Sequence, residues 1–115
     1  MPPDAVWVTS TYFESWKARD FDTLRLLLAD DVTFDGPLAH LDNADDCING
    51  LQEMSKIVTD IVVRKVWVDG DDVLTWFELH TSVARPKPTA NWSKVQNGKI
   101  TSIRVVFDAR GLAPS

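Results

Sequence analysis

Apolar residues in the first third of the chain recur at spacings of mostly three and four, which is typical of helices with one buried face. Asp4 and Asp22 can each accept hydrogen bonds from the backbone N–H groups of a first helical turn. We therefore predict helices over about residues 4–19 and 22–29, and a third over 44–58, where the same spacing returns. The apolar stripe of the first two helices comprises Val6, Phe13, Trp16, Phe21, Leu24, Leu27 and Leu28.

The second half of the chain has the pattern of strands joined by tight turns. Valine-rich and alternating segments run over about 61–69, 73–83, 89–95 and 99–108, after a short extended segment at 32–35. Gly70 and the pair Asn97-Gly98 suit hairpin turns between them. The pattern predicts one α+β domain over residues 1–115, with three helices followed by a meander of four long strands. Since the sheet must cover its inner face, we expect a curved, mixed or antiparallel sheet wrapped as a cone around the helices.

The charge balance excludes several classes of partner. The net charge is −5 and the pI is near 4.8. An acidic surface repels phosphate backbones and anionic lipids, so we expect neither nucleic acid nor a membrane as partner. No stretch approaches the roughly 20 apolar residues of a transmembrane helix, and the N-terminus lacks the basic start and apolar run of a secretory signal. We expect a cytoplasmic protein whose single cysteine, Cys47, forms no internal disulfide.

The chain carries a heavy aromatic load, with five tryptophans and five phenylalanines among 115 residues. Aromatic side chains pack cores and oligomer interfaces, and they also line pockets for flat or hydrophobic ligands. Cofactor motifs are missing: one cysteine and two histidines cannot form a standard zinc site, and no Gly-x-Gly-x-x-Gly or P-loop sequence is present. We expect no metal and no cofactor.

Three segments of the chain resemble one known superfamily. They are 16–22 (Trp-Lys-Ala-Arg-Asp-Phe-Asp), 28–37 (Leu-Ala-Asp-Asp-Val-Thr-Phe-Asp-Gly-Pro) and 97–108, which starts Asn-Gly-Lys-Ile and ends Val-Phe-Asp. With the order of the elements, they are similar to the nuclear-transport-factor-two-like superfamily, which includes ketosteroid isomerases and SnoaL-like polyketide cyclases. The resemblance implies the cone-shaped fold and a homodimer that pairs through the outer face of the sheet. It implies less about activity, because this scaffold hosts enzymes, binding modules and association domains.

The resemblance also implies roles for individual residues. Ketosteroid isomerases use a carboxylate base and two hydrogen-bond donors that hold the substrate oxygen. Tyr12 falls on the tyrosine donor, and Asn91 falls near the second donor. The base falls on Gly36, which cannot accept a proton, so steroid-isomerase chemistry in its usual form is not expected. Asp35 replaces the base only if the strand is bulged or shifted by one position, because adjacent strand residues point to opposite faces.

The long strand over 73–83 alternates two sets of residues, and the resemblance implies that Trp76, Glu78 and His80 face the cavity. Their Cβ atoms would then lie about 7 Å apart along the strand. A glutamate beside apolar walls has a raised pKa, and histidine exchanges protons near neutrality, so Glu78 and His80 are the favoured candidates for acid–base work. The opposite orientation, with both residues on the outer surface, stays open.

Together these residues predict a pocket for a small hydrophobic molecule. In the first hypothesis, a cofactor-independent isomerase or cyclase acts on a carbonyl-containing substrate, and Tyr12 and Asn91 polarise its oxygen. A proton is then moved by Glu78, His80 or Asp35. In the alternative, the chain binds a hydrophobic ligand without reaction, or it is a dimeric association domain. The expected pocket walls are Trp16, Phe34, Trp76, Trp92 and Phe107.

Overall fold

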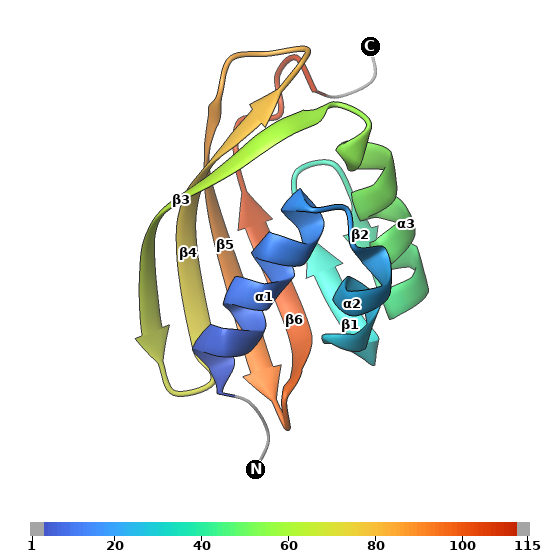
Figure 1. Cartoon of the computed structure of the whole chain (residues 1–115), viewed down its shortest axis with the longest axis vertical. Helices are drawn as coiled ribbons and strands as arrows, with labels where there is room; N and C mark the ends of the chain where they lie inside the picture. The colour runs from blue at the N-terminus through green and yellow to red at the C-terminus, as the bar shows by residue number, and fades with distance from the viewer. Residues whose placement is uncertain (1–3, 113–115) are drawn as a thin grey trace.

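The chain folds into three helices and one six-stranded sheet in the computed structural model, which describes residues 4–112 (Figure 1). The helices are α1 (Ala5–Lys17), α2 (Phe21–Leu26) and α3 (Ala44–Ser55). The strands are β1 (Leu28–Asp35), β2 (His40–Leu41), β3 (Val58–Asp69), β4 (Asp72–Thr81), β5 (Lys87–Gln96) and β6 (Lys99–Val106). The three helices and the four-strand meander are as predicted. Across residues 4–112, no helix has the length and apolar character needed to cross a membrane.

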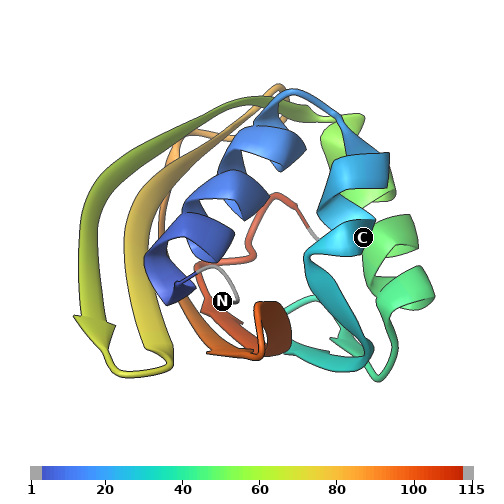
Figure 2. The ribbon, with the colours of Figure 1, turned by 60° about the horizontal axis from the view of Figure 1, so that its bottom comes forward.

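The sheet is mixed and curved. Its strand order is β2-β1-β6-β5-β4-β3, with β1 parallel to β6 and every other neighbouring pair antiparallel. The strands curl around α1 without closing into a barrel, and α2 and α3 lie on the β1 side of the sheet (Figure 2). The predicted α+β cone is confirmed.

Two local predictions around α2 are wrong. Residues 28 and 29 do not complete this helix but begin β1, because Leu28 pairs with Ile100 on β6 and the Leu27 carbonyl accepts the Ile100 N–H at 2.8 Å. The helix is capped by Asp20 rather than by Asp22. The Asp20 carboxylate accepts both the backbone N–H of Thr23 at 3.2 Å and the Thr23 hydroxyl at 2.7 Å. Sheet pairing and side-chain capping therefore override the simple apolar spacing here.

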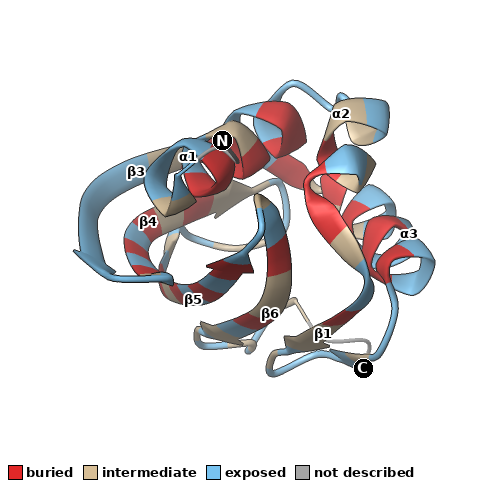
Figure 3. Cartoon of the chain, turned by 90° about the horizontal axis from the view of Figure 1, so that it is seen from below, coloured by how far each residue is buried: buried red, intermediate tan, exposed pale blue. Residues whose placement is uncertain are grey.

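The inner face of β4 is the set opposite to the one expected. Val73, Thr75, Phe77 and Leu79 are buried, whereas the residues between them are exposed or half-buried (Figure 3). The Phe77 ring packs on Phe13 of α1, with ring centroids 5.0 Å apart. The contact with α1 places this set toward the helices, so the expectation that Trp76, Glu78 and His80 face the cavity is wrong.

Polar contacts fasten α1 to the junction between α3 and β3. The Trp16 indole N–H donates to the Ser55 hydroxyl at 3.1 Å. Arg19 donates to the carbonyl oxygens of Ser55 at 2.9 Å and Val58 at 3.2 Å. These contacts satisfy backbone groups at the end of α3 that the helix itself leaves unpaired. They hold α1 and α3 in a fixed arrangement over the inner face of the sheet.

Candidate functional site

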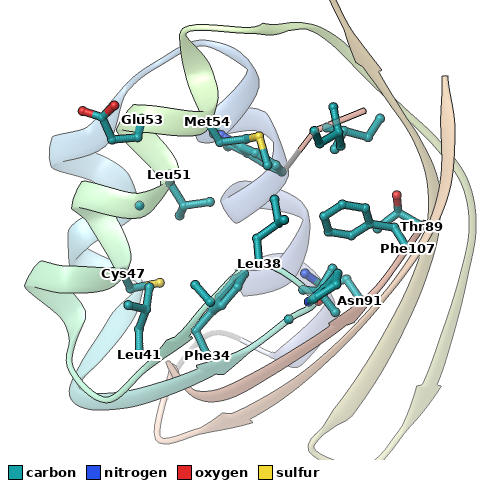
Figure 4. A pocket seen from close by; sticks show the side chains of 18 of the residues that line it. Phe34, Leu38, Leu41, Cys47, Leu51, Glu53, Met54, Thr89, Asn91 and Phe107 are labelled. Carbon is teal, nitrogen blue, oxygen red and sulfur yellow. The ribbon is translucent and has the colours of Figure 1, made fainter. Parts of the chain in front are cut away.

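A cavity of about 410 Å³ lies between the inner face of the sheet and α3. One wall comes from β4, β5 and the end of β6, the opposite wall from α3, and the connection from β1 to β2 covers one side (Figure 4). Most of its lining is apolar, and the residues that line it include Leu38, Leu51, Met54, Leu79 and Val105. The few polar side chains on the lining therefore determine what the cavity can hold.

Tyr12 presents a neutral hydroxyl to the cavity from α1. Its ring is 1% exposed and packs edge-on against Phe13, with centroids 5.1 Å apart, and against Trp16 at 6.4 Å. Burial raises the pKa of the Tyr12 hydroxyl well above its usual value, and the nearby Cys47 adds to this effect. No residue in the described range 4–112 hydrogen-bonds the hydroxyl. It keeps its proton through the neutral and mildly alkaline range and can donate it in a hydrogen bond.

Asn91 supplies a second polar group, from the inner face of β5. It is 2% exposed and lies opposite Thr75 in the pairing with β4. Its Oδ1 accepts a hydrogen bond from the Ser93 hydroxyl at 2.7 Å. The Nδ2 group makes no hydrogen bond within residues 4–112 and is not among the side-chain atoms fully enclosed by protein. Asn91 can therefore donate to a molecule in the cavity.

Three of the predicted wall residues lie on the cavity. Trp16 comes from α1, Phe34 from β1, and Phe107 follows the end of β6. Because the Trp16 N–H is already bonded to Ser55, this residue offers only its ring face to the cavity. The three aromatic rings add apolar surface without adding further hydrogen-bond donors.

The other two predicted wall residues are outside, on the outer face of the sheet. Trp76 is 43% exposed and Trp92 is 44% exposed. The Trp92 N–H donates to Asp72 at 2.9 Å, and the Arg104 guanidinium lies 5.2 Å from the centre of its ring. Because Trp92 follows Asn91 directly on a strand, it must point to the opposite face. The prediction that these two tryptophans form pocket walls is wrong.

Glu78 and His80 also lie on the outer face. The Arg64 guanidinium donates to both oxygens of Glu78, at 3.1 and 3.2 Å, and His80 Nε2 lies 3.3 Å from the same carboxylate. Hydrogen bonds from Arg64 and then from His80 lower the pKa of Glu78, where the sequence led us to expect a raised one. Neither residue lines the cavity. This pair is a surface ion cluster and cannot act on a molecule inside the cone.

Asp35 points away from the cavity, whereas its neighbours Phe34 and Gly36 line it. Its carboxylate pairs with His40 Nδ1, and His40 Nε2 lies 2.8 Å from Asp42. The irregularity in β1 falls between Leu28 and Thr33 and does not turn Asp35 inward. Asp35 therefore does not substitute for the missing base. A Cβ added at Gly36 would lie 3.2 Å from the Phe34 ring. The Phe34 ring therefore fills the space that a side chain at position 36 would need.

Sequence reasoning missed most of the lining that comes from α3 and from the loop before it. Cys47, Leu51 and Met54 were predicted only as the apolar stripe of a helix, and that stripe also faces the cavity. Glu53 is the one carboxylate among the described lining residues. Its side chain is largely exposed, is turned away from the cavity in Figure 4, and pairs with Lys56 at 3.0 Å. The lining also carries the Thr89 hydroxyl, which donates to the Lys87 carbonyl at 3.0 Å. The described lining residues thus place a few neutral polar groups on an apolar wall and direct no ionised group into the interior.

The fold is shared by solved structures of distant proteins. An NTF2-like protein of unknown function from Cytophaga hutchinsonii superposes with a TM-score of 0.86 at 21% identity, over 97% of this chain and 96% of that one. An LEH-like epoxide hydrolase from M. tuberculosis gives 0.80 at 21% identity, over 94% and 85% of the two chains. A de novo designed protein with a curved β-sheet gives 0.82 at 23% identity, over 92% and 86%. At these identities the likeness shows the fold alone.

The family is shown by sequence. No curated protein matches the chain. The model of the SnoaL-like domain matches residues 9–103, which include α1 from Thr9 onward, α2, α3 and the strands through most of β6. This range contains Tyr12, Asn91 and nearly all of the cavity lining described above. The chain therefore belongs to the SnoaL-like domain family, within the nuclear-transport-factor-two-like fold.

Proposed function

We propose that this protein binds a small, hydrophobic, uncharged molecule that carries a carbonyl-type oxygen. The observation that carries the proposal is the presence of two unengaged donors, Tyr12 and Asn91, on the wall of an otherwise apolar cavity. Its volume of about 410 Å³ lies within the usual range of small-molecule sites. An oxygen held between the two donors would orient the molecule, while burial of its apolar surface supplies most of the affinity.

The absence of a cation around the cavity favours an uncharged ligand. Glu53 is the one charged side chain among the described lining residues, and its carboxylate is paired outside with Lys56. A buried carboxylate or phosphate would lose its hydration without gaining an ionic partner, which costs several kcal/mol. A neutral ketone, ester or epoxide loses far less and regains its hydrogen bonds from Tyr12 and Asn91.

The proposal is tested by titrating two cyclic ketones, menthone and 2-decalone, into the protein and following tryptophan fluorescence. Tyr12→Phe and Asn91→Leu each remove one donor, and each is expected to weaken binding by about tenfold. Trp76→Phe is the control, because this residue lies on the outer face, and it should leave affinity unchanged. Absence of binding by both ketones, or equal binding by the wild type and the two donor variants, would contradict the proposal.

Cofactor-independent isomerase or cyclase chemistry is the second candidate. Donors preorganised around a carbonyl oxygen stabilise the enolate that forms when a neighbouring proton leaves. One fold neighbour is an epoxide hydrolase, so the same scaffold carries catalysis in that protein. The proton itself needs a base, and Glu53, the one carboxylate among the described lining residues, would have to leave Lys56 and turn inward to act as one.

Menthone separates the two candidates, because removal of the α-proton beside its isopropyl group, followed by return of a proton to the opposite face of the enolate, converts it to isomenthone. Binding without epimerisation above the buffer rate supports the binding proposal. Epimerisation that is lost in Tyr12→Phe would favour the catalytic candidate instead. Glu53→Gln then tests whether this carboxylate acts as the base, since the variant would retain binding and lose turnover.

We also propose that two copies of the chain pair through the outer face of the sheet. That face exposes a continuous set of apolar side chains on adjacent strands, and larger patches of this kind mark interaction sites. It also carries both signs of charge, since Arg104 and the Arg64–Glu78 pair lie on the same face, so a second copy related by twofold symmetry can match it. The exposed apolar set comprises Leu74, Trp76, Trp92 and Val106.

A further inference from the structure

Ser93 touches the candidate site only through Asn91. The two residues are two positions apart on β5, so both point to the inner face. Ser93 has no exposed surface and is not part of the cavity lining. Its hydroxyl oxygen lies 2.7 Å from Asn91 Oδ1.

The direction of this hydrogen bond is fixed by the hydroxyl hydrogen of Ser93. A buried hydroxyl needs an acceptor, and the Asn91 carboxamide is the one hydrogen-bond partner of the Ser93 side chain within residues 4–112. If the carboxamide turned by half a rotation, its NH₂ group would donate to Ser93 and the serine hydrogen would lose its acceptor. An unsatisfied buried donor is costly, because it has lost its hydrogen bonds to water without replacement. The carboxamide therefore keeps Oδ1 on Ser93 and leaves Nδ2 free for the cavity.

We infer that Ser93 is a positioning residue that makes the site selective for ligand oxygens that only accept hydrogen bonds. This inference rests on the proposed function and adds the class of oxygen that the site takes. A ketone or ester oxygen has two lone pairs and accepts one hydrogen from Tyr12 and one from Asn91. Every group that faces it is then satisfied.

An alcohol of the same skeleton brings one hydrogen more. If its oxygen accepts from Asn91 and Tyr12, its own hydrogen finds no acceptor on either of these two side chains. If it donates to the Tyr12 oxygen instead, the Tyr12 hydrogen is left without a partner. Either arrangement leaves one buried donor unpaired, so the alcohol binds more weakly by about tenfold. Tyr12 alone cannot enforce this difference, since a hydroxyl both donates and accepts; the fixed carboxamide of Asn91 enforces it.

Loss of the Ser93 hydroxyl releases the carboxamide. In Ser93→Ala, Oδ1 and Nδ2 can exchange places, and Oδ1 can then accept the hydrogen of an alcohol. The preference for the ketone should fall because binding of the alcohol improves. Ser93→Thr keeps a hydroxyl at the same position and should keep the preference. A purely structural role of Ser93 would weaken both ligands together and leave their ratio unchanged.

The experiment measures dissociation constants for two matched pairs, menthone with menthol and 2-decalone with 2-decalol, in the wild type, Ser93→Ala and Ser93→Thr. Ser102→Ala, on β6 outside the cavity, controls for loss of a serine from the sheet. We expect the wild type, Ser93→Thr and Ser102→Ala to favour each ketone by about tenfold, and Ser93→Ala to reduce this ratio to within about threefold. If the ketones bind, equal affinity for ketone and alcohol in the wild type, or an unchanged ratio in Ser93→Ala, overturns the inference while the binding proposal stands. Failure of all four molecules to bind the wild type overturns both.

Discussion

The Arg64 guanidinium donates hydrogen bonds to both carboxylate oxygens of Glu78, on the face of the sheet that points away from the cavity. Arg64 reaches Glu78 because β3 has an irregularity between Val63 and Lys65, which places an extra residue beside β4. Because Glu78 is bonded to Arg64 on this outer face, its carboxylate does not contact a ligand inside the cavity.

Glu78→Gln is therefore expected to leave ligand binding intact. Affinity for menthone should stay within about twofold of the wild type, and the free energy of unfolding should change little, because ion pairs at the surface contribute little to stability. Fluorescence titration and urea denaturation measure the two quantities. A tenfold loss of affinity in this variant, with stability preserved, would show that Glu78 takes part in ligand binding.

Replacing a tryptophan on the outer face should separate the proposed dimer. Trp92→Glu places a charge in the middle of the exposed apolar set, and a buried unpaired charge opposes association. Light scattering after gel filtration should show twice the chain mass of 12.9 kDa for the wild type and the single mass for the variant. Leu26→Glu is the control, since Leu26 is 69% exposed on α2, away from this face. A monomeric wild type at micromolar concentration would contradict the pairing.

His40 should make stability depend on pH. Its hydrogen bond with Asp35, and then the charge of Asp42, raise the pKa of His40 above its usual value of about 6.5. A raised pKa in the folded state means that the stabilisation is fully present below 6.5 and is lost as the pH rises through the folded-state pKa. The stability difference between the wild type and His40→Gln should therefore be larger at pH 6 than at pH 9, as measured by urea denaturation. A difference that stays constant or grows toward pH 9 would show that the pair does not form.

Gly50→Ala should raise stability and narrow the cavity at once. Gly50 lies inside α3, where alanine is preferred over glycine by about 0.5–1 kcal/mol. A Cβ added here meets one side-chain atom, Leu41 Cδ1, at 3.3 Å, and the end of this leucine can move. Because Gly50 also lines the cavity, the rigid bicyclic ligand 2-decalone should bind more weakly than in the wild type. A melting temperature below that of the wild type would mean that the Leu41 side chain cannot move away from the added methyl group.

Much of the fold could be predicted from the sequence, because its local patterns agree with one another. The apolar spacing predicts α1 and α3, and the turn residues Gly70 and Asn97-Gly98 predict two hairpins. Tertiary packing agrees with these local preferences, so the predicted elements are present in the fold. The start of β1 at Leu28 could not be read this way, since its partner Ile100 is far away in sequence. The two-residue strand β2 is likewise too short to have a period.

The faces of β4 show why half of the site was misplaced. Its inner set includes the polar Thr75, and its outer set includes the apolar Leu74 and Trp76, so hydrophobic alternation does not tell the two faces apart. Tertiary contacts decide, through the packing of Phe77 on Phe13. Simple alternation could have excluded Trp92 from the walls, given that Asn91 was already placed inside. Tyr12 and Asn91 reach the same cavity, although their shared role stays a prediction.

The central claim is that Tyr12 and Asn91 hold one ligand oxygen between them inside the cone. The most direct test is a crystal structure of the protein with 2-decalone bound. We predict that the ketone oxygen lies within about 2.7–3.2 Å of both Tyr12 Oη and Asn91 Nδ2, with the rings against the apolar wall. A ketone found with its oxygen directed away from these two residues, or bound elsewhere on the molecule, would contradict the account.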